Sequence, residues 1–97
     1  MEKVYISGKI TGLNITIARY NFYSAQKHLL LKGLNPINPF DIVKYDEDKH
    51  WEDYMIECIN VLFKCDAIFM LKNWQDSKGA RIERHIAAEM GLKIMYE

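Results

Sequence analysis

The sequence has few of the residues that cross-link a small domain or bind a structural metal. It contains two cysteines, Cys58 and Cys65, and three scattered histidines. Two cysteines cannot supply a disulfide framework or four zinc ligands. Along one predicted helix they lie roughly 10 Å apart, beyond the about 4.4–6.8 Å between the Cα atoms of a disulfide. We therefore expect no metal and no cofactor, and a reduced, cytoplasmic protein.

The sequence also lacks an excess of either charge and any long hydrophobic run. Lys and Arg number 13, Asp and Glu number 13, and the formal net charge is zero. A protein that binds a nucleic-acid polymer or an anionic membrane needs a basic excess, so neither partner is expected. No apolar run reaches the about 18 residues of a membrane span, and the start does not resemble a signal peptide. Zero net charge also permits self-association.

The length fits one domain over residues 1–97. Surface scaling for 11.4 kDa gives about 5,800 Å² exposed in the folded state against roughly 16,500 Å² unfolded. About 65% of the surface of the chain can therefore be buried, which is enough for a core without disulfides or metals.

Apolar patterning predicts strands that alternate with helices. The predicted strands cover residues 4–6, 34–37, 67–71 and 93–96. The predicted helices run from about residue 16 to Gly33, from a cap at Asp48 to residue 62, and from 79 to 90, with loops over 41–50 and 72–78. This alternation predicts an α/β fold of three layers, with a parallel sheet in the order 2-1-3-4 and helices on both faces. Pro36 favours an edge position for the second strand.

Glu83 does not fit the amphipathic pattern of the helix over 79–90. At about 100° per residue it lies inside the apolar arc, and its helix neighbours Ala80, Ile86 and Ala87 cannot pair with it. A carboxylate that faces the sheet is partly desolvated, which raises its pKa and makes it a candidate functional group. A side chain that bends to the rim and pairs with a lysine or arginine is the alternative.

Two loops have features suited to an anion such as phosphate. One is the start of the same helix, where Ser77 and Gly79 offer a hydroxyl and free backbone amides. The other follows the first strand and consists of Gly8, Lys9, Ile10, Thr11 and Gly12. Taken alone, this second loop equally fits an ordinary strand-to-helix turn, since it matches no established phosphate-binding motif.

The two tryptophans have different predicted roles. Trp51 begins the apolar face of the second helix. Trp74 lies in a polar loop at the expected ligand edge of the sheet, where it either stacks on a base or sugar or covers the core.

Several motifs follow one another in an order that resembles a known family. They are Tyr5-Ile6-Ser7-Gly8-x-Ile10-Thr11-Gly12, Asn38-Pro39, Trp51-x-Asp53-Tyr54-Met55, Cys65-Asp66-Ala67-Ile68, Trp74-x-x-Ser77-x-Gly79-Ala80-x-x-Glu83 and Ala87-x-x-x-Gly91. The chain resembles small, often phage-borne, uncharacterised proteins related to nucleoside 2-deoxyribosyltransferases. The resemblance covers nearly the whole chain and implies a compact flavodoxin-like domain.

The resemblance also implies a chemistry and a set of residues. The wider superfamily cleaves N-glycosidic bonds, and by position Glu83 is the nucleophile that attacks the anomeric carbon of a deoxyribose. Tyr5 matches a tyrosine near the nucleophile, and Ser77 matches a serine that contacts a 5′-phosphate in the hydrolases of the group. The expected substrate-binding residues are Gly8, Lys9, Ile10, Thr11, Gly12, Asn38, Trp74, Ser77 and Gly79.

The sequence departs from the enzymes at Cys58, which stands where they carry an aspartate that contacts the base. Lys9 and Asn73 replace a usual proline and glycine. The enzymes also continue into a segment that completes the pocket of a neighbouring subunit, and we expect a homodimer or larger homo-oligomer.

The leading hypothesis is an N-glycosidase or deoxyribosyltransferase acting on a nucleoside or nucleoside 5′-monophosphate. The alternatives are a nucleotide-binding module of the same fold without turnover, and a small interaction protein that uses exposed aromatic side chains.

Overall fold

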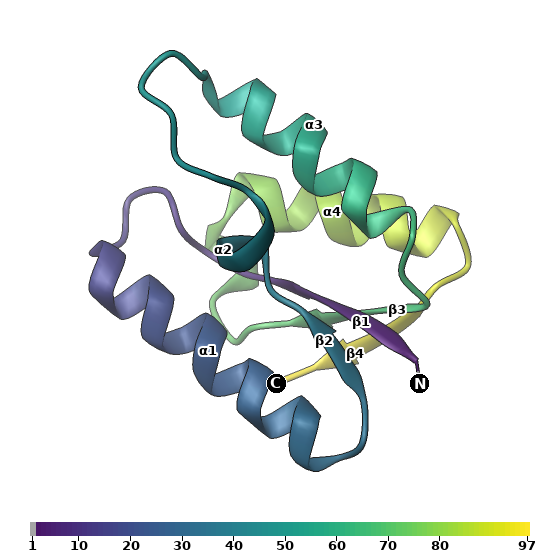
Figure 1. The fold of residues 1–97 in the computed structure, drawn as a ribbon. Helices are drawn as coiled ribbons and strands as arrows, with labels where there is room; N and C mark the ends of the chain where they lie inside the picture. The colour runs from purple at the N-terminus through teal and green to yellow at the C-terminus, as the bar shows by residue number, and fades with distance from the viewer. Residues whose placement is uncertain (1) are drawn as a thin grey trace.

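Four parallel strands form a single sheet in the computed structural model, which describes residues 2–97 (Figure 1). The strands are β1 (Lys3–Ser7), β2 (Asn35–Ile37), β3 (Ala67–Met70) and β4 (Lys93–Tyr96). They lie in the order β2-β1-β3-β4, and each neighbouring pair is parallel. The predicted fold class and strand order are confirmed. Pro36 lies on the edge strand β2, where its missing amide donor breaks no ladder within the sheet.

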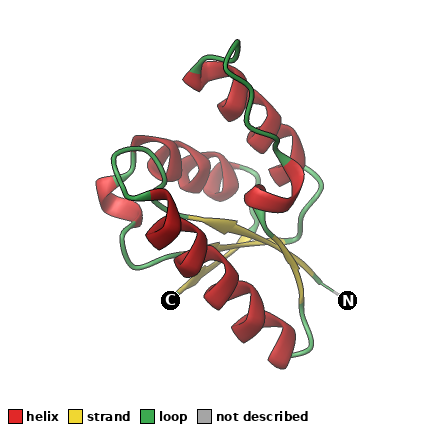
Figure 2. Cartoon of the chain, turned by 60° about the vertical axis from the view of Figure 1, so that its left-hand side comes forward, coloured by secondary structure: helices red, strands yellow, loops and turns green. Residues whose placement is uncertain are grey.

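Helices cover both faces of the sheet, which gives the three predicted layers (Figure 2). Helix α1 (Ile15–Leu31) packs on one face, and α3 (Trp51–Leu62) and α4 (Lys78–Glu89) pack on the other. A short helix α2 (Pro39–Ile42) follows β2, and a 3₁₀ turn η1 (Trp74–Asp76) precedes α4. None of the helices in residues 2–97 has both the length and the apolar character to cross a bilayer.

The alternation of side chains along β1 divides the core into two parts. Val4 and Ile6 point into the layer under α1, where they pack with Phe22 and Leu29. Successive strand residues face opposite sides of a sheet, so Tyr5 and Ser7 face α3 and α4 instead. Tyr5 belongs to the second core cluster, and both side chains are almost fully buried. The strand thus presents two polar side chains to the helix that carries the candidate carboxylate.

One local prediction, the start of the second helix, differs from the structure. Helix α3 begins after His50, not after Asp48. The backbone amide of His50 donates to the carboxylate of Asp53, 2.9 Å away, whereas the amide of Asp48 donates to Asp46 within the preceding turn. Asp53 at the third helical position therefore fixes the start of the helix.

Two further segments that were predicted as turn or loop contain helical turns. In α2, Asn38 is the N-cap, because its side-chain oxygen accepts from the backbone amide of Phe40 at 2.9 Å. Pro39 occupies the first helical position, where a missing amide is tolerated. The loop over 72–78 includes η1, and α4 begins one residue earlier than predicted, directly after Ser77.

Candidate active site

A cavity of about 1170 Å³ opens at the carboxyl end of β1. Its walls come from the loop after β1, from α1 and α2, from α3, and from the start of α4. Loops that follow neighbouring parallel strands gather at this edge, which is where open α/β sheets bind ligands. Within the described chain, the charged lining residues are Arg19, Lys44, Asp76, Lys78 and Glu83.

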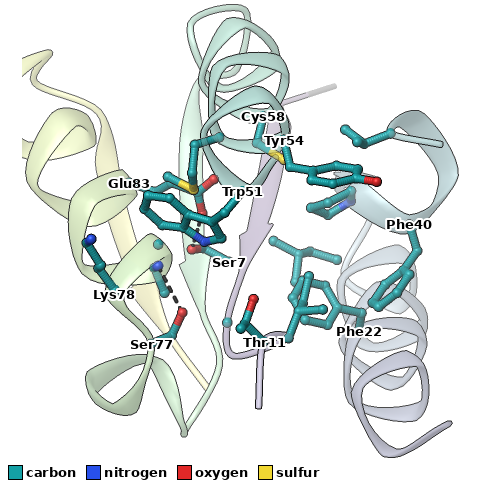
Figure 3. A pocket seen from close by; sticks show the side chains of 18 of the residues that line it. Ser7, Thr11, Phe22, Phe40, Trp51, Tyr54, Cys58, Ser77, Lys78 and Glu83 are labelled. Atoms are coloured by element: carbon teal, nitrogen blue, oxygen red, sulfur yellow. Dashed lines mark hydrogen bonds between the residues drawn. The ribbon is translucent and has the colours of Figure 1, made fainter. Parts of the chain in front are cut away.

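Glu83 lines this cavity as a buried carboxylate, and only 6% of the residue is exposed. The hydroxyl of Tyr5 donates to Oε2 at 2.8 Å, and the hydroxyl of Ser7 donates to Oε1 at 2.6 Å. Figure 3 shows Ser7 directed at Glu83 from the strand behind it. Each carboxylate oxygen therefore has a fixed hydrogen-bond donor. The expectation of a desolvated Glu83 is confirmed.

The pKa values of this network follow from its burial. Burial raises the pKa of Glu83, and the hydrogen bonds from Ser7 and Tyr5 oppose that rise because they stabilise the ionised form. Burial, with the charge of Glu83 as the next cause, holds the pKa of Tyr5 well above its usual value. Tyr5 thus keeps its proton at neutral pH and acts as a donor.

Cys58 lies on α3 in the same part of the cavity, near Glu83 (Figure 3). Tyr5 and Glu83 both act on the pKa of its thiol. Burial raises the pKa of its thiol to about 11, and the nearby hydroxyl of Tyr5 opposes the rise only in part. The thiol is therefore protonated at neutral pH. It is far too weak an acid or base to replace a carboxyl group in proton transfer.

The start of α4 forms a polar wall of the cavity. Ser77 is the N-cap, and its hydroxyl oxygen accepts from the backbone amide of Ala80 at 3.1 Å. Lys78 places its ammonium 4.7 Å from the centre of the Trp51 ring. Gly79 lets α3 approach closely, since a Cβ there would lie 3.0 Å from the Met55 sulfur. Ser77, Lys78 and Gly79 all line the cavity.

The loop after β1 contributes only in part. Gly8, Ile10 and Thr11 line the cavity, whereas Lys9 and Gly12 are absent from its lining. The backbone amide of Lys9 donates to the side chain of Asn73 at 3.0 Å, which ties this loop to the one after β3. At Gly8 a Cβ would lie 2.5 Å from Leu71, so any side chain is excluded.

Asn38 and Trp74 do not line the cavity, and both serve the fold instead. The side chain of Asn38 is buried, caps α2 and donates to Gln26 at 2.9 Å. Trp74 packs against the core cluster under α4, with the guanidinium of Arg84 5.0 Å from its ring centre. Of the two roles considered for Trp74, covering the core is the one that its position supports.

Ser7 and Trp51 are two of the lining residues that the sequence did not predict. Ser7 is not among the site residues predicted from the sequence, although it shares the face of Tyr5 by the two-residue period of a strand. Trp51 was assigned to the apolar face of α3, but it lines the cavity. Its place at the first helical position, next to the carboxyl edge of the sheet, was the signal that could have found it.

The opposite wall of the cavity is aromatic and apolar (Figure 3). Phe22, Phe40 and Tyr54 line it, and the guanidinium of Arg19 lies 5.1 Å from the centre of the Phe40 ring. Phe22 is almost fully buried, so a planar ring of a ligand can stack on the half-buried rings of Phe40 and Tyr54. Among residues 2–97, the His, Cys, Asp and Glu side chains form no group of three or more that is placed to hold a metal ion.

A parallel sheet covered on both faces, with a buried carboxylate in a cavity at its carboxyl edge, defines an α/β protein with a candidate small-molecule site. The chain belongs to the family described as a domain of unknown function (DUF4406), which matches residues 2–96. No curated protein matches the sequence.

The fold is similar to that of a solved structure, a 2-desoxiribosyltransferase from Leishmania mexicana. The TM-score is 0.69 at 20% sequence identity, and the match covers 99% of this chain and 63% of that one. This chain thus spans about 63% of the length of that protein. The predicted relation to an uncharacterised family with the deoxyribosyltransferase fold is confirmed.

Proposed function

We propose that the protein cleaves the N-glycosidic bond of a nucleoside or nucleoside 5′-monophosphate and passes the sugar to another base or to water. The observation that carries the proposal is the Glu83 carboxylate, which is buried in the cavity with a donor on each oxygen. The fold shared with a 2-desoxiribosyltransferase supports it.

Glu83 acts as the nucleophile. One of its oxygens forms a bond to the anomeric carbon as the bond to the base breaks, through an oxocarbenium-like transition state. Attack by the acceptor on the same carbon then releases the carboxylate, so configuration is retained. Tyr5 and Ser7 fix the orientation of the carboxylate, and its desolvation makes it more reactive than a hydrated one.

The groups at the start of α4 are suited to binding the 5′-phosphate of a nucleotide. Ser77, Lys78 and Gly79 combine a hydroxyl, a cation and the amides of a helix N-terminus at one wall of the cavity. Gly8, Ile10 and Thr11 of the loop after β1 line the same cavity. We therefore favour 5′-monophosphates over free nucleosides.

The test is base release from the four 2′-deoxynucleoside 5′-monophosphates, followed by chromatography. Glu83→Gln should lower turnover by at least about a thousandfold, since it removes the nucleophile and keeps the volume. Glu89→Gln, an exposed position on the same helix, is the matched control and should keep turnover. Equal release by the wild type and Glu83→Gln for every base would end the catalytic proposal.

Cys58 favours a second candidate, a nucleotide-binding module without turnover. A protonated thiol with a pKa of about 11 stands beside the carboxylate, where it cannot assist a leaving base. This candidate predicts that nucleotides raise the melting temperature of the protein although no base is released.

We further propose that the protein forms a homodimer or a larger homo-oligomer. Light scattering on the protein as it elutes from a size-exclusion column measures its mass and tests this directly.

A further inference from the structure

Glu83 is a buried carboxylate whose hydrogen-bond partners are both neutral. Tyr5 and Ser7 supply hydroxyl groups, and neither carries a positive charge. Within residues 2–97 the ion pair that forms joins Lys49 to Glu57 and does not involve Glu83. A buried charge without an opposite charge is costly, so this carboxylate is set up for a cation that the chain itself does not supply.

Two of the three cationic side chains that line the cavity lie over aromatic rings, and none of the three, Arg19, Lys44 and Lys78, forms an ion pair with Glu83. Lys78 lies over the ring of Trp51, and Arg19 lies over that of Phe40. These two cations remain available for a phosphate, whereas Glu83 lines the cavity without a cationic partner.

The groups around Glu83 also cannot protonate a leaving base. Its neighbours are the hydroxyls of Tyr5 and Ser7 and the thiol of Cys58, all weak acids at neutral pH. Among the described residues of the lining, the other carboxyl group is Asp76, on the exposed turn before α4, and no histidine is present. A neutral purine or pyrimidine leaves poorly as an anion, so most nucleosides need such an acid.

We propose that the substrate is a nucleotide whose base carries a positive charge, such as an N7-alkylated purine or a pyridinium ring. This rests on the proposed function and adds the substrate class. A cationic ring supplies the charge that Glu83 lacks, and it leaves as a neutral molecule that takes no proton.

The step balances without an acid. A carboxylate oxygen of Glu83 forms a bond to C1′ as the bond from C1′ to the ring nitrogen breaks, and the electron pair returns to the ring and cancels its charge. Water then attacks C1′, the bond to Glu83 breaks, the carboxylate is restored and one proton passes to solvent. The products are a neutral base, the sugar phosphate and a proton.

The first experiment compares two substrates that differ by one methyl group, 2′-deoxyguanosine 5′-monophosphate and its N7-methylated form, with nicotinamide mononucleotide as the pyridinium arm. Spontaneous base loss is measured without protein and with Glu83→Gln, and is subtracted. We expect kcat/KM for the methylated nucleotide to exceed that for the unmethylated one by at least about 100-fold, the contribution of the missing acid. A ratio below about tenfold overturns the inference.

Cys58→Asp and Asp76→Asn separate the possible sources of a proton. Cys58→Asp should raise turnover of the unmethylated nucleotide and so lower the ratio, because it places a carboxyl group near the base. Asp76→Asn should leave the ratio above about 100-fold. If Asp76→Asn instead abolishes turnover of a neutral substrate that the wild type cleaves well, Asp76 is the acid and the inference is wrong.

A binding measurement does not depend on turnover. Calorimetry with 7-methylguanosine 5′-monophosphate and guanosine 5′-monophosphate should show at least about tenfold tighter binding of the cation by the wild type, and Glu83→Gln should remove the difference. Equal affinities in the wild type overturn the inference. Release of neutral bases at high rates would leave the proposed function intact, whereas no release from any substrate would defeat the proposed function itself.

Discussion

Glu83 combines two demands that conflict in most proteins, since its carboxylate is both buried and available to a cavity. Its desolvation disfavours the ionised form, and the donors Ser7 and Tyr5 recover part of that loss. A carboxylate held in this way costs stability in the free protein, and in the proposed function its desolvation makes it more reactive.

Replacing Glu83 by Gln should stabilise the free protein above the ordinary pKa of glutamate, about 4.3. Because the folded pKa is raised, the native state binds more protons than the unfolded state just above that value, and wild-type stability falls as pH rises through this window. The gain in melting temperature should therefore be small near pH 4 and larger at pH 8. Thermal unfolding of both proteins across this range is the measurement, with Glu89→Gln as control. A gain that shrinks toward pH 8 would contradict the raised pKa.

Replacing Ser7 by Ala should raise the pKa of Glu83 further. The Ser7 hydroxyl is the larger of the two groups that lower that pKa, and its removal leaves Oε1 without its donor. Carboxyl-carbon NMR titration of Glu83 measures the shift directly, and the acid limb of kcat/KM should move to higher pH with it. Tyr5→Phe should move the pKa in the same direction. A lower pKa in either variant would refute this account of the network.

At the scale of elements, the strands and their order follow from the sequence because apolar patterning and chain connectivity constrain them together. The residues 67–71 are apolar at every position, as a central strand requires, and Pro36 restricts β2 to an edge. Glu83 was found because a helix has a fixed period, so one charged residue on an apolar face is visible without a structure.

The remaining site residues depend on tertiary contacts that no local pattern contains. Asn38 has the residue type of a ligand contact, yet its partners are Gln26 and its own helix. Trp51 and Trp74 differ in role because only one of them reaches the cavity. Helix α2 was missed since four residues are too few to show a period.

Two glycines test the contacts between elements. Gly8→Ala should destabilise the protein by about 1–3 kcal/mol, because the added Cβ would lie 2.5 Å from Leu71 at the end of β3. Gly79→Ala should change stability by less than about 1 kcal/mol, since the nearest atom is the sulfur of the flexible Met55 side chain and alanine favours the helix. Urea unfolding measures both. A larger loss for Gly79→Ala than for Gly8→Ala would contradict this comparison.

At the scale of the whole molecule, 97 residues reach the dimensions expected of a folded chain of that length. The Cα radius of gyration is 12.4 Å, against about 12.5 Å from general scaling. The accessible surface of 6062 Å² is likewise near the about 5,800 Å² expected from the mass. The cavity is therefore a feature of a fully packed domain.

Ligand binding should stabilise this domain as a unit. A nucleoside monophosphate at about 100 times its Kd adds about 2.7 kcal/mol, which corresponds to a rise in Tm of about 10 °C or more at this size. Lys78→Gln should raise the Kd for monophosphates by about tenfold, because it removes a charge near the phosphate. It should leave the Kd for free nucleosides unchanged. Lys64→Gln, an exposed position after α3, is the matched control. Equal losses of affinity for monophosphates and for free nucleosides would contradict a contact between Lys78 and the phosphate.

The hydrogen bonds to Glu83 join positions 78 and 76 residues apart, from the first strand to the last helix. No fragment that lacks either end of this pairing holds the carboxylate with both donors. The proposed nucleophile is therefore held by both donors only once β1 and α4 have packed together. Any activity of the protein would therefore require the complete fold. A partly folded chain, or a fragment that lacks β1 or α4, would have no activity.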